Sequence, residues 1–403
     1  MYRVFTDGFA EELERIDGMD IPSELACMAG DNVKSALSGN TLREEDFLAF
    51  LSPAAAPFIE QIAQIANAET LRNFGRSIQL FTPLYLANHC TNRCVYCGFS
   101  ARRDIPRLKL TPAEVEKEAK AIASTGLRKI LALTGDAPAT TGPEYLAGCV
   151  AVLTRHFTSV GIETPAMTVE EYALQVEAGA DSMTMFQETY NARRYEELHP
   201  SGPKRDFWFR LDAPQRALIG GMRSVNLGPL LGLGDWREDV FHVGLHARWL
   251  MEHYPEAEVS ISLPRMRPHT EGGEVRFQPV RVDNAEFVQA LVALRCFLPK
   301  AGITMSSRES AWLRDKLLPL GVTRISAGVC TTVGGHSKKA DSSNAEETGK
   351  PQFDISDDRS VSEMTEALLA MGYQPVFSDW LLPGCGESKL TRGVSEALRS
   401  PNS

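Results

Sequence analysis

The chain of 403 residues contains no run of 18 apolar residues, the length that a membrane-spanning helix needs. Its start, MYRVFTDGFAEELERIDG, is acidic and amphipathic, whereas a secretory leader is basic and then apolar. Positive charge is scarce as well, since the formal net charge is -10. These absences predict a cytoplasmic protein with no membrane partner, and they argue against a nucleic acid as partner.

The sequence also lacks a disulfide framework. Five of its eight cysteines stand alone along a long chain, which is not the pattern of a small secreted domain. Cys27, Cys149 and Cys296 lie among aliphatic residues, and we expect them to be small buried core residues. Hydrophobic residues make up 43% of the chain and charged residues 23%, as in a folded globular protein.

The other three cysteines lie together in CTNRCVYCGFS, residues 90–100. No second CxxC pair is present to complete a zinc site, so zinc is disfavoured. Three thiolates on one loop suit a [4Fe-4S] cluster whose fourth iron has no protein ligand. Cys90, Cys94 and Cys97 are therefore the predicted metal ligands, and the open iron would chelate a small molecule through an amine and a carboxylate.

Between residues 80 and 329, short runs rich in β-formers alternate with stretches of helical period. This order and length predict an α/β fold, a (β/α)8 TIM-type barrel, with a doubly wound open sheet as the alternative. We expect an N-terminal helical extension at 1–75, the barrel at 76–330, and a C-terminal loop, helix and tail at 331–403. The expected strands are 80–88, 129–135, 161–167, 182–187, 224–230, 259–264, 302–307 and 324–329.

Local signals mark where several helices begin. A Ser or Thr three residues before a Glu has the spacing of a capping box, in which the two residues satisfy each other's backbone N–H groups. We assign helix starts to four pairs with this spacing, Thr41 and Glu44, Thr111 and Glu114, Thr168 and Glu171, and Ser360 and Glu363.

Catalytic groups of such barrels lie at the C-terminal ends of the strands and in the loops beyond them. Several polar side chains follow the expected strands, and a barrel would gather them with the three cysteines around one mouth. They are Asp136, Glu163, Gln187, Glu188, Arg265, Arg267, Arg308 and Ser326.

The spacing Cys90-x-x-x-Cys94-x-x-Cys97, directly after the first strand, resembles the signature of the radical S-adenosylmethionine enzymes. The resemblance implies a [4Fe-4S] cluster and S-adenosylmethionine as cofactors, and a 5′-deoxyadenosyl radical that abstracts hydrogen from a substrate. It places Tyr96 near the adenine, and it places Thr134, Gly135 and Asp136 near the methionine amine, with Asp where Glu is commoner. We assign to the same cofactor side Glu163, Gln187, Glu188, Arg265 and Arg267.

Further motifs narrow the resemblance. They are PLYLAN at 83–88, YCGFS at 96–100, QETY at 187–190, PRMRP at 264–268, SSRES at 306–310, Gly334 with Gly335, Gln352 with Phe353, and DDR at 357–359. Together they are similar to the aromatic amino acid lyases, and most of all to the tyrosine lyases of thiamine synthesis, the 2-iminoacetate synthases. The resemblance implies cleavage of the Cα–Cβ bond of L-tyrosine to 2-iminoacetate (dehydroglycine) and p-cresol, after abstraction of hydrogen from the amino group.

The same resemblance assigns the substrate side of the mouth. Arg308 matches the arginine that holds the substrate carboxylate, and a planar guanidinium suits such a bidentate contact. Ser326 matches a hydroxyl near the amine, and Tyr85 and Phe186 match pocket residues. The implied partners are an electron donor such as flavodoxin or ferredoxin and the thiazole synthase that consumes dehydroglycine.

Plainer interpretations stay open for some of these residues. Arg308 could pair with Glu309 or cap the helix that follows, and Tyr85 could be a core aromatic on a strand. His336 lies in a polar stretch and is expected to be solvated, and Cys330 is not expected to bind the cluster. The DDR motif could be only an ion-paired helix start.

Three other functions compete with tyrosine cleavage to dehydroglycine. A branch that makes carbon monoxide and cyanide from tyrosine uses a second cluster, but beyond Cys330 this chain has only Cys385. Another branch acts on tryptophan and keeps the arginine clamp. A non-enzymatic iron–sulfur protein is the third alternative, although a carrier normally shields every iron with protein ligands.

Overall fold

The computed structural model describes residues 8–39, 41–267, 269–271, 274–341 and 351–377, and it shows a closed barrel of eight parallel strands. The order runs from β1 through β2, β3, β4, β5, β6 and β9 to β10, and the pairing of β10 with β1 closes the barrel. This confirms the predicted barrel and rules out the open sheet. The barrel strands are Ser77–Ala87 (β1), Lys129–Thr134 (β2), Ser159–Glu163 (β3), Ser182–Glu188 (β4), Ser224–Pro229 (β5), Glu258–Ser262 (β6), Gly302–Met305 (β9) and Arg324–Ser326 (β10).

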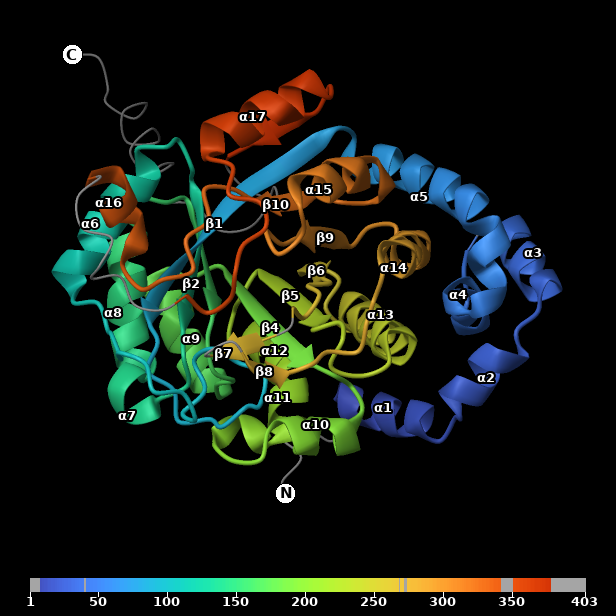
Figure 1. Ribbon diagram of the computed structural model, residues 1–403, viewed down its shortest axis with the longest axis horizontal. Helices are drawn as coiled ribbons and strands as arrows, with labels where there is room; N and C mark the ends of the chain where they lie inside the picture. Colours follow the sequence, from blue (N-terminus) through green and yellow to red (C-terminus); the bar gives the residue numbers. More distant parts are fainter. Residues whose placement is uncertain (1–7, 40, 268, 272–273, 342–350, 378–403) are drawn as a thin grey trace, which may run out of the picture.

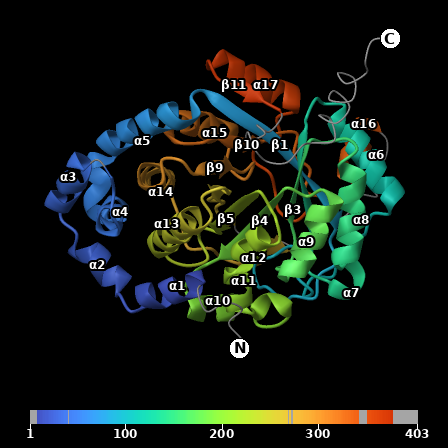
Figure 2. The same cartoon turned by 180° about the vertical axis from the view of Figure 1, so that it is seen from behind.

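Helices cover the outside of the barrel (Figures 1 and 2). Helix α6 begins at Pro112 because the Thr111 hydroxyl accepts from the Glu114 N–H, and α9 begins at Val169 through the same box. The covering helices are Pro112–Ala123 (α6), Pro138–Thr141 (α7), Pro143–Leu153 (α8), Val169–Ala178 (α9), Ala192–Leu198 (α10), Phe207–Leu211 (α11), Ala213–Ile219 (α12), Trp236–His253 (α13), Asn284–Phe297 (α14) and Ala311–Leu317 (α15), with short 3-10 turns at Pro203–Arg205 (η2) and Leu318–Leu320 (η3).

The N-terminal helices form an arc along one side of the barrel, beside α13 and α14 (Figure 1). The rings of Phe47 and Phe297 stack with centroids 4.2 Å apart, and Gln289 Nε2 donates to the carbonyls of Phe50 and Ser52 at 2.8 Å. This extension is therefore part of the same hydrophobic core as the barrel. Its elements are Phe9–Asp17 (α1), Ile21–Cys27 (α2), Gly30–Ser38 (α3), Glu44–Leu51 (α4), Pro53–Phe58 (η1) and Ile59–Phe74 (α5).

The structure adds elements that the sequence pattern did not predict. The segment expected to be a long loop from residue 331 contains the helix α16 (Gly335–Asp341), which packs on α6, and residues 342–350 lie outside the described chain. A short antiparallel hairpin, β7 (His269–Glu271) and β8 (Glu274–Phe277), follows β6. After α17 (Val361–Ala370), the expected extended piece is β11 (Gln374–Val376), which pairs with the start of β1 outside the barrel. Cys385 and the tail lie outside the described residues.

The single cysteines follow the prediction only in part. Cys149 and Cys296 are buried as expected, but Cys27 is exposed, because it is the last residue of α2 at the rim of the helical arc. Among the described residues, no helix is long and apolar enough to cross a membrane.

Candidate functional site

A cavity of about 470 Å³ opens at the C-terminal ends of the barrel strands. It gathers fourteen of the sixteen predicted site residues. These are Tyr85, Cys90, Cys94, Tyr96, Cys97, Thr134, Gly135, Asp136, Glu163, Phe186, Glu188, Arg267, Arg308 and Ser326.

The cysteine loop leaves β1 at Ala87 and is held in shape by its own polar groups. The Arg107 guanidinium donates to four carbonyls of the loop, those of Asn88, Phe99, Ser100 and Arg103, at 2.8 to 3.1 Å. The Thr91 N–H donates to the Asp136 carbonyl at 2.7 Å, which ties the loop to the end of β2. The loop is thus preorganised by contacts that involve none of the three thiols.

The three thiols suit a cluster rather than a single ion. Cys94 is only 4% exposed, and burial raises its pKa to about 12 and also raises that of Cys97. In the described chain, no three His, Cys, Asp or Glu side chains are placed to share one metal ion. In a four-iron cluster each thiolate binds a different iron, so the three thiols need not share one ion. All three cysteines are free and face the same cavity, so the donor set fits the cluster.

The end of β2 offers acceptors toward the cavity. Asp136 Oδ2 accepts from Asn92 Nδ2 at 2.8 Å, while Asp136 Oδ1 and Thr134 Oγ1 are buried and find no hydrogen-bond partner among the residues that the structure describes. A buried acceptor without a donor is costly, so these atoms are suited to a bound amine. The pair therefore fits the amino-acid end of S-adenosylmethionine.

In this part of the site, the backbone at Gly135 lies very close to the backbone at His89. A Cβ there would lie 2.3 Å from the His89 carbonyl oxygen and 3.1 Å from the Cys90 Cβ. Gly135→Ala should therefore displace the loop that carries Cys90, lowering iron content and weakening S-adenosylmethionine binding by at least about tenfold, a shift of ~1.4 kcal/mol. Iron analysis and equilibrium binding measure the change.

Gly148→Ala on α8 is the matched control, since a Cβ there meets nothing within 4 Å. It should leave iron content unchanged and stabilise the helix by up to about 1 kcal/mol. Equal iron content and equal affinity in the two variants would show that the close approach at Gly135 has no bearing on the cofactors.

Tyr96 lies in a small apolar cluster with Cys94 and Leu230. The His199 Nδ1–H donates to the Tyr195 carbonyl at 2.8 Å, because a carbonyl only accepts, so His199 Nε2 accepts from the Tyr96 hydroxyl at 2.8 Å. This contact fixes the plane of the Tyr96 ring beside the cysteine loop.

Glu188 has a φ of 74°, and it is the non-glycine residue with positive φ among those described. A register shift between Phe186 and Glu188 produces this conformation at the end of β4. The carboxylate forms an ion pair with Lys204 and lies 3.9 Å from Arg210. Burial opposes its ionisation, but these two cations hold its pKa below the ordinary value, so it is charged at neutral pH. A strained, charged residue in the cavity points to a functional role.

Glu163, at the end of β3, shows the opposite shift. Burial and the nearby charge of Glu188 raise its pKa to about 7, against the opposing effects of Arg308, Arg210 and Lys204. A carboxyl whose pKa is higher in the folded state than in the unfolded state stabilises the fold while it is protonated. Its contribution to the free energy of unfolding is therefore lost as the pH rises through about 7.

The free energy of unfolding of the wild-type protein, measured relative to that of Glu163→Gln, should therefore fall between about pH 5 and about pH 8, by up to roughly 3 kcal/mol. Glutamine has a similar size and no titration, so the difference between the two proteins isolates this carboxyl from Asp239, whose pKa burial also raises to about 7. Urea unfolding across this range measures the difference. A pH-independent difference would rule out a carboxyl that titrates near neutrality.

Arg308, after β9, lines the same cavity as the three cysteines. Its guanidinium carbon lies 3.6 Å from the centroid of the Phe353 ring, and in the described chain it has no carboxylate partner. The alternative pairing with Glu309 is wrong, because Arg265 and Arg267 occupy that carboxylate, and Ser310 caps the following helix instead. Burial lowers the pKa of Arg308, and the nearby Glu188 and Glu163 act in the opposite direction.

Two other predicted substrate-side residues are also held by hydrogen bonds. The Tyr85 hydroxyl donates to Gln352 Oε1 at 2.7 Å, and its ring packs edge-on against Phe99. Ser326 is 4% exposed, and its carbonyl accepts from Arg314. Tyr85 therefore lines the cavity and is not only a core aromatic.

Two predicted residues do not line the cavity. Gln187 points away from it and donates to the Phe207 carbonyl at 3.4 Å, because side chains alternate along β4. Arg265 is held by Glu309, with Nε to Oε1 at 2.9 Å, and by the Val282 carbonyl. Both therefore support neighbouring elements, and neither is placed to contact a molecule in the cavity.

Sequence reasoning missed other cavity residues. Lys204 and Arg210 lie on η2 and α11, where no strand end marks them, and Gln352 and Phe353 were noted only as a motif. His336 was expected to be solvated, but it is half-buried, and its Nε2 lies 2.9 Å from the Pro83 carbonyl oxygen. Cys330 lies beside Thr332, with Sγ and Oγ1 3.2 Å apart, and does not line the cavity.

Comparisons with known proteins agree with this geometry. Residues 84–243 match the Radical SAM superfamily, and residues 262–374 match the Biotin and Thiamin Synthesis associated domain. The chain is 36% identical over 374 residues to 2-iminoacetate synthase of Escherichia coli (strain K12), covering 92% of this chain and 96% of that protein.

Solved structures show the same similarity. HydG, a maturase of the [FeFe]-hydrogenase, is 28% identical with a TM-score of 0.78, and the match covers 92% of this chain and 79% of HydG. Methylornithine synthase (PylB), at 20% identity and a TM-score of 0.67, shares the fold.

Proposed function

The chain belongs to the radical S-adenosylmethionine enzymes, in the family of 2-iminoacetate synthase, and from this we propose that it cleaves the Cα–Cβ bond of L-tyrosine. The products are 2-iminoacetate and p-cresol, with methionine and 5′-deoxyadenosine formed from the cofactor, for thiamine thiazole synthesis. The observation that carries the proposal is Arg308, which has no carboxylate partner among the described residues and lines the same cavity as the three-cysteine loop.

In this proposal the cofactor half of the cavity is formed by the loop after β1 and by the end of β2. Cys90, Cys94 and Cys97 would hold the cluster, while Thr134 and Asp136 would accept from the methionine amine. When bound, the cluster and S-adenosylmethionine supply a carbon radical that abstracts hydrogen. The protein contributes position, because the loop, the β2 end and Tyr96 are fixed by contacts within the chain.

The substrate half has the chemistry of an amino-acid site. The Arg308 fork would bind the carboxylate, and the Ser326 hydroxyl would lie near the amine. Holding both polar ends of the amino acid decides which of its hydrogens is nearest to the radical. Tyr85, Phe186 and Phe99 supply aromatic surface for a ring in the same cavity.

The length of the relatives favours 2-iminoacetate formation over the HydG reaction. The chain covers 96% of the Escherichia coli 2-iminoacetate synthase but only 79% of HydG. Part of HydG therefore lies outside the match. Flavodoxin or ferredoxin as the electron donor and the thiazole synthase as the recipient of 2-iminoacetate are part of the same proposal.

Product analysis after anaerobic reconstitution tests the function. Reduced protein with S-adenosylmethionine and L-tyrosine should form p-cresol and 5′-deoxyadenosine, detected by mass spectrometry. Formation of a methylindole acid from tryptophan, without p-cresol from tyrosine, would assign the chain to the tryptophan branch. Carbon monoxide or cyanide as product would assign it to the HydG reaction.

A further inference from the structure

Residues 351–359, which we call the strap, cross the mouth of the barrel after the described part of α16. Pro351, Gln352, Phe353 and Asp354 line the cavity. The strap is fixed through its backbone at two places: the Gln352 N–H donates to the Thr331 carbonyl at 3.2 Å, and the Ser356 N–H donates to the Ser307 carbonyl at 2.9 Å. It is therefore an ordered wall of the cavity.

Phe353 holds Arg308 without neutralising it. The ring covers one face of the guanidinium, with the guanidinium carbon 3.6 Å from the ring centroid, while the N–H groups on the guanidinium edge stay available. Arg265 shows the contrast: it also lies over a phenylalanine, Phe287, but its N–H groups are used by Glu309. A ring rather than a carboxylate thus orients Arg308 toward an anion from outside the chain.

Gln352 joins the strap to the cofactor side. Its Oε1 accepts from the Tyr85 hydroxyl at 2.7 Å. Its carbonyl oxygen lies so close to Gly98 that a Cβ on Gly98 would be 2.5 Å away. Gln352 therefore touches both a predicted substrate residue and the loop next to Cys97.

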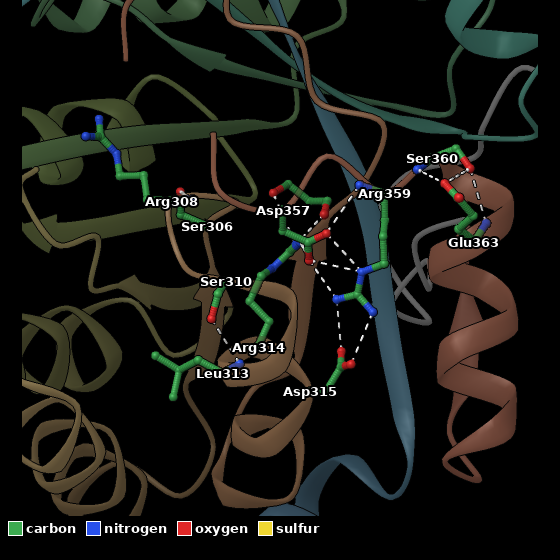
Figure 3. Close-up of polar contacts among 11 residues, drawn as sticks. Ser306, Arg308, Ser310, Leu313, Arg314, Asp315, Asp357, Arg359, Ser360 and Glu363 are labelled. Carbon is green, nitrogen blue, oxygen red and sulfur yellow. Dashed lines mark hydrogen bonds and ion pairs between the residues drawn. The ribbon is translucent and has the colours of Figure 1, made fainter. Parts of the chain in front are cut away.

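Asp357 joins the strap to Arg314 (Figure 3). Its buried carboxylate pairs with Arg314, and Arg314 in turn donates to the carbonyl of Ser326 and lies 3.5 Å from its hydroxyl. Arg359 reinforces this network, with ion pairs to Asp357 at 2.6 Å and to Asp315 at 2.9 Å. Arg308 points away from this network in Figure 3, so the two groups of contacts are separate.

We propose that the strap positions the substrate half of the site, with Phe353 and Gln352 as positioning residues that set the orientation of Arg308 and Tyr85. The proposal rests on the proposed function: the strap would orient an aromatic amino acid within the site. Three of the four predicted substrate residues, Arg308, Tyr85 and Ser326, each contact the strap directly or through one side chain. Loosening it should leave cofactor cleavage active but poorly coupled to substrate cleavage.

The test uses the full-length reconstituted protein, with p-cresol and 5′-deoxyadenosine measured together. Phe353→Leu keeps apolar volume but removes the ring, and it should raise KM for tyrosine about tenfold. It should also raise the ratio of 5′-deoxyadenosine to p-cresol, while Phe353→Trp should restore both values. Phe74→Leu removes a similar ring under Arg295, 4.8 Å from its centroid and outside the cavity, and should change neither.

Gln352→Met keeps the length of the side chain but removes the oxygen that accepts from Tyr85. It tests the role of the strap if Phe353→Leu does not fold. It should raise the same product ratio with unchanged iron content. Wild-type KM and wild-type coupling in both variants would overturn the role of the strap. Absence of p-cresol from the wild-type protein would instead overturn the proposed function, so the two failures are distinguishable.

Discussion

Replacing Cys94 by serine should abolish both the iron–sulfur absorption of the reconstituted protein and its cleavage of S-adenosylmethionine. Cys94 is the most buried of the three cysteines described in the loop and packs against Tyr96 and Leu230. A serine hydroxyl is a poor substitute for a thiolate, and two remaining thiolates leave half of the irons without protein ligands. All chemistry in the proposed reaction depends on the cluster. The variant should therefore lose the enzyme's whole rate acceleration over the uncatalysed reaction, on the order of 10⁶-fold or more.

Cys27→Ser is the control for this experiment, because Cys27 is exposed at the end of α2 and does not line the cavity. It should retain wild-type iron content and wild-type formation of 5′-deoxyadenosine. A Cys94→Ser protein that still holds a complete cluster and cleaves S-adenosylmethionine would show that the metal ligands lie elsewhere.

The barrel was predictable because its strands are short apolar segments separated by helices with local start signals. Thr111, Thr168 and Ser360 begin helices as expected, since a capping box depends only on residues three apart. The expected capping box of Thr41 and Glu44 was wrong. Helix α4 begins at Glu44, after Arg43, and the Arg43 N–H donates to Asp46. Two acidic residues within one turn could each complete a box, and the sequence does not decide between them.

Long-range pairings were not predictable from local pattern. β1 pairs with β2, β10 and β11 along different parts of its length, so the closure of the barrel depends on contacts between residues far apart in sequence. The strap has no periodicity either. Its polar composition indicates a loop, and only its contacts with Ser307, Arg308 and Arg314 show that it is an ordered wall.

The rule that active groups follow parallel strands located most of the site. It failed at Gln187 for a reason visible in the sequence, because alternation along β4 places Phe186 and Glu188 on one face and Gln187 on the other. It failed at Arg265 because Glu309, a buried glutamate 44 residues later, accepts from its Nε and one terminal nitrogen, a partner that no spacing rule identifies. Lys204 and Arg210 were missed because they lie on connecting helices.

Replacing Arg308 by lysine should lower kcat/KM for tyrosine about 100-fold, which corresponds to ~2.7 kcal/mol. The variant keeps a positive charge but loses the planar fork that would bind both carboxylate oxygens, and it loses the flat face that stacks on Phe353. Binding of S-adenosylmethionine should change little, because Cys90, Thr134 and Asp136 lie at the ends of β1 and β2, whereas Arg308 follows β9. Steady-state p-cresol formation and equilibrium binding of the cofactor separate the two effects.

Arg205→Lys, at an exposed arginine paired with Glu196, controls for the exchange of one cation for another and should leave both measurements unchanged. Arg308→Gln removes the charge as well, and it should be slower than Arg308→Lys if the carboxylate is the group that is bound. A planar fork and a point charge differ most when two oxygens are held at once. Tyrosinol has no carboxylate, so it should compete with tyrosine equally well in wild type and Arg308→Lys. Unchanged tyrosine kinetics in Arg308→Lys would place the carboxylate site at another cation of the cavity, whose other arginines are Arg210, Arg267 and Arg324.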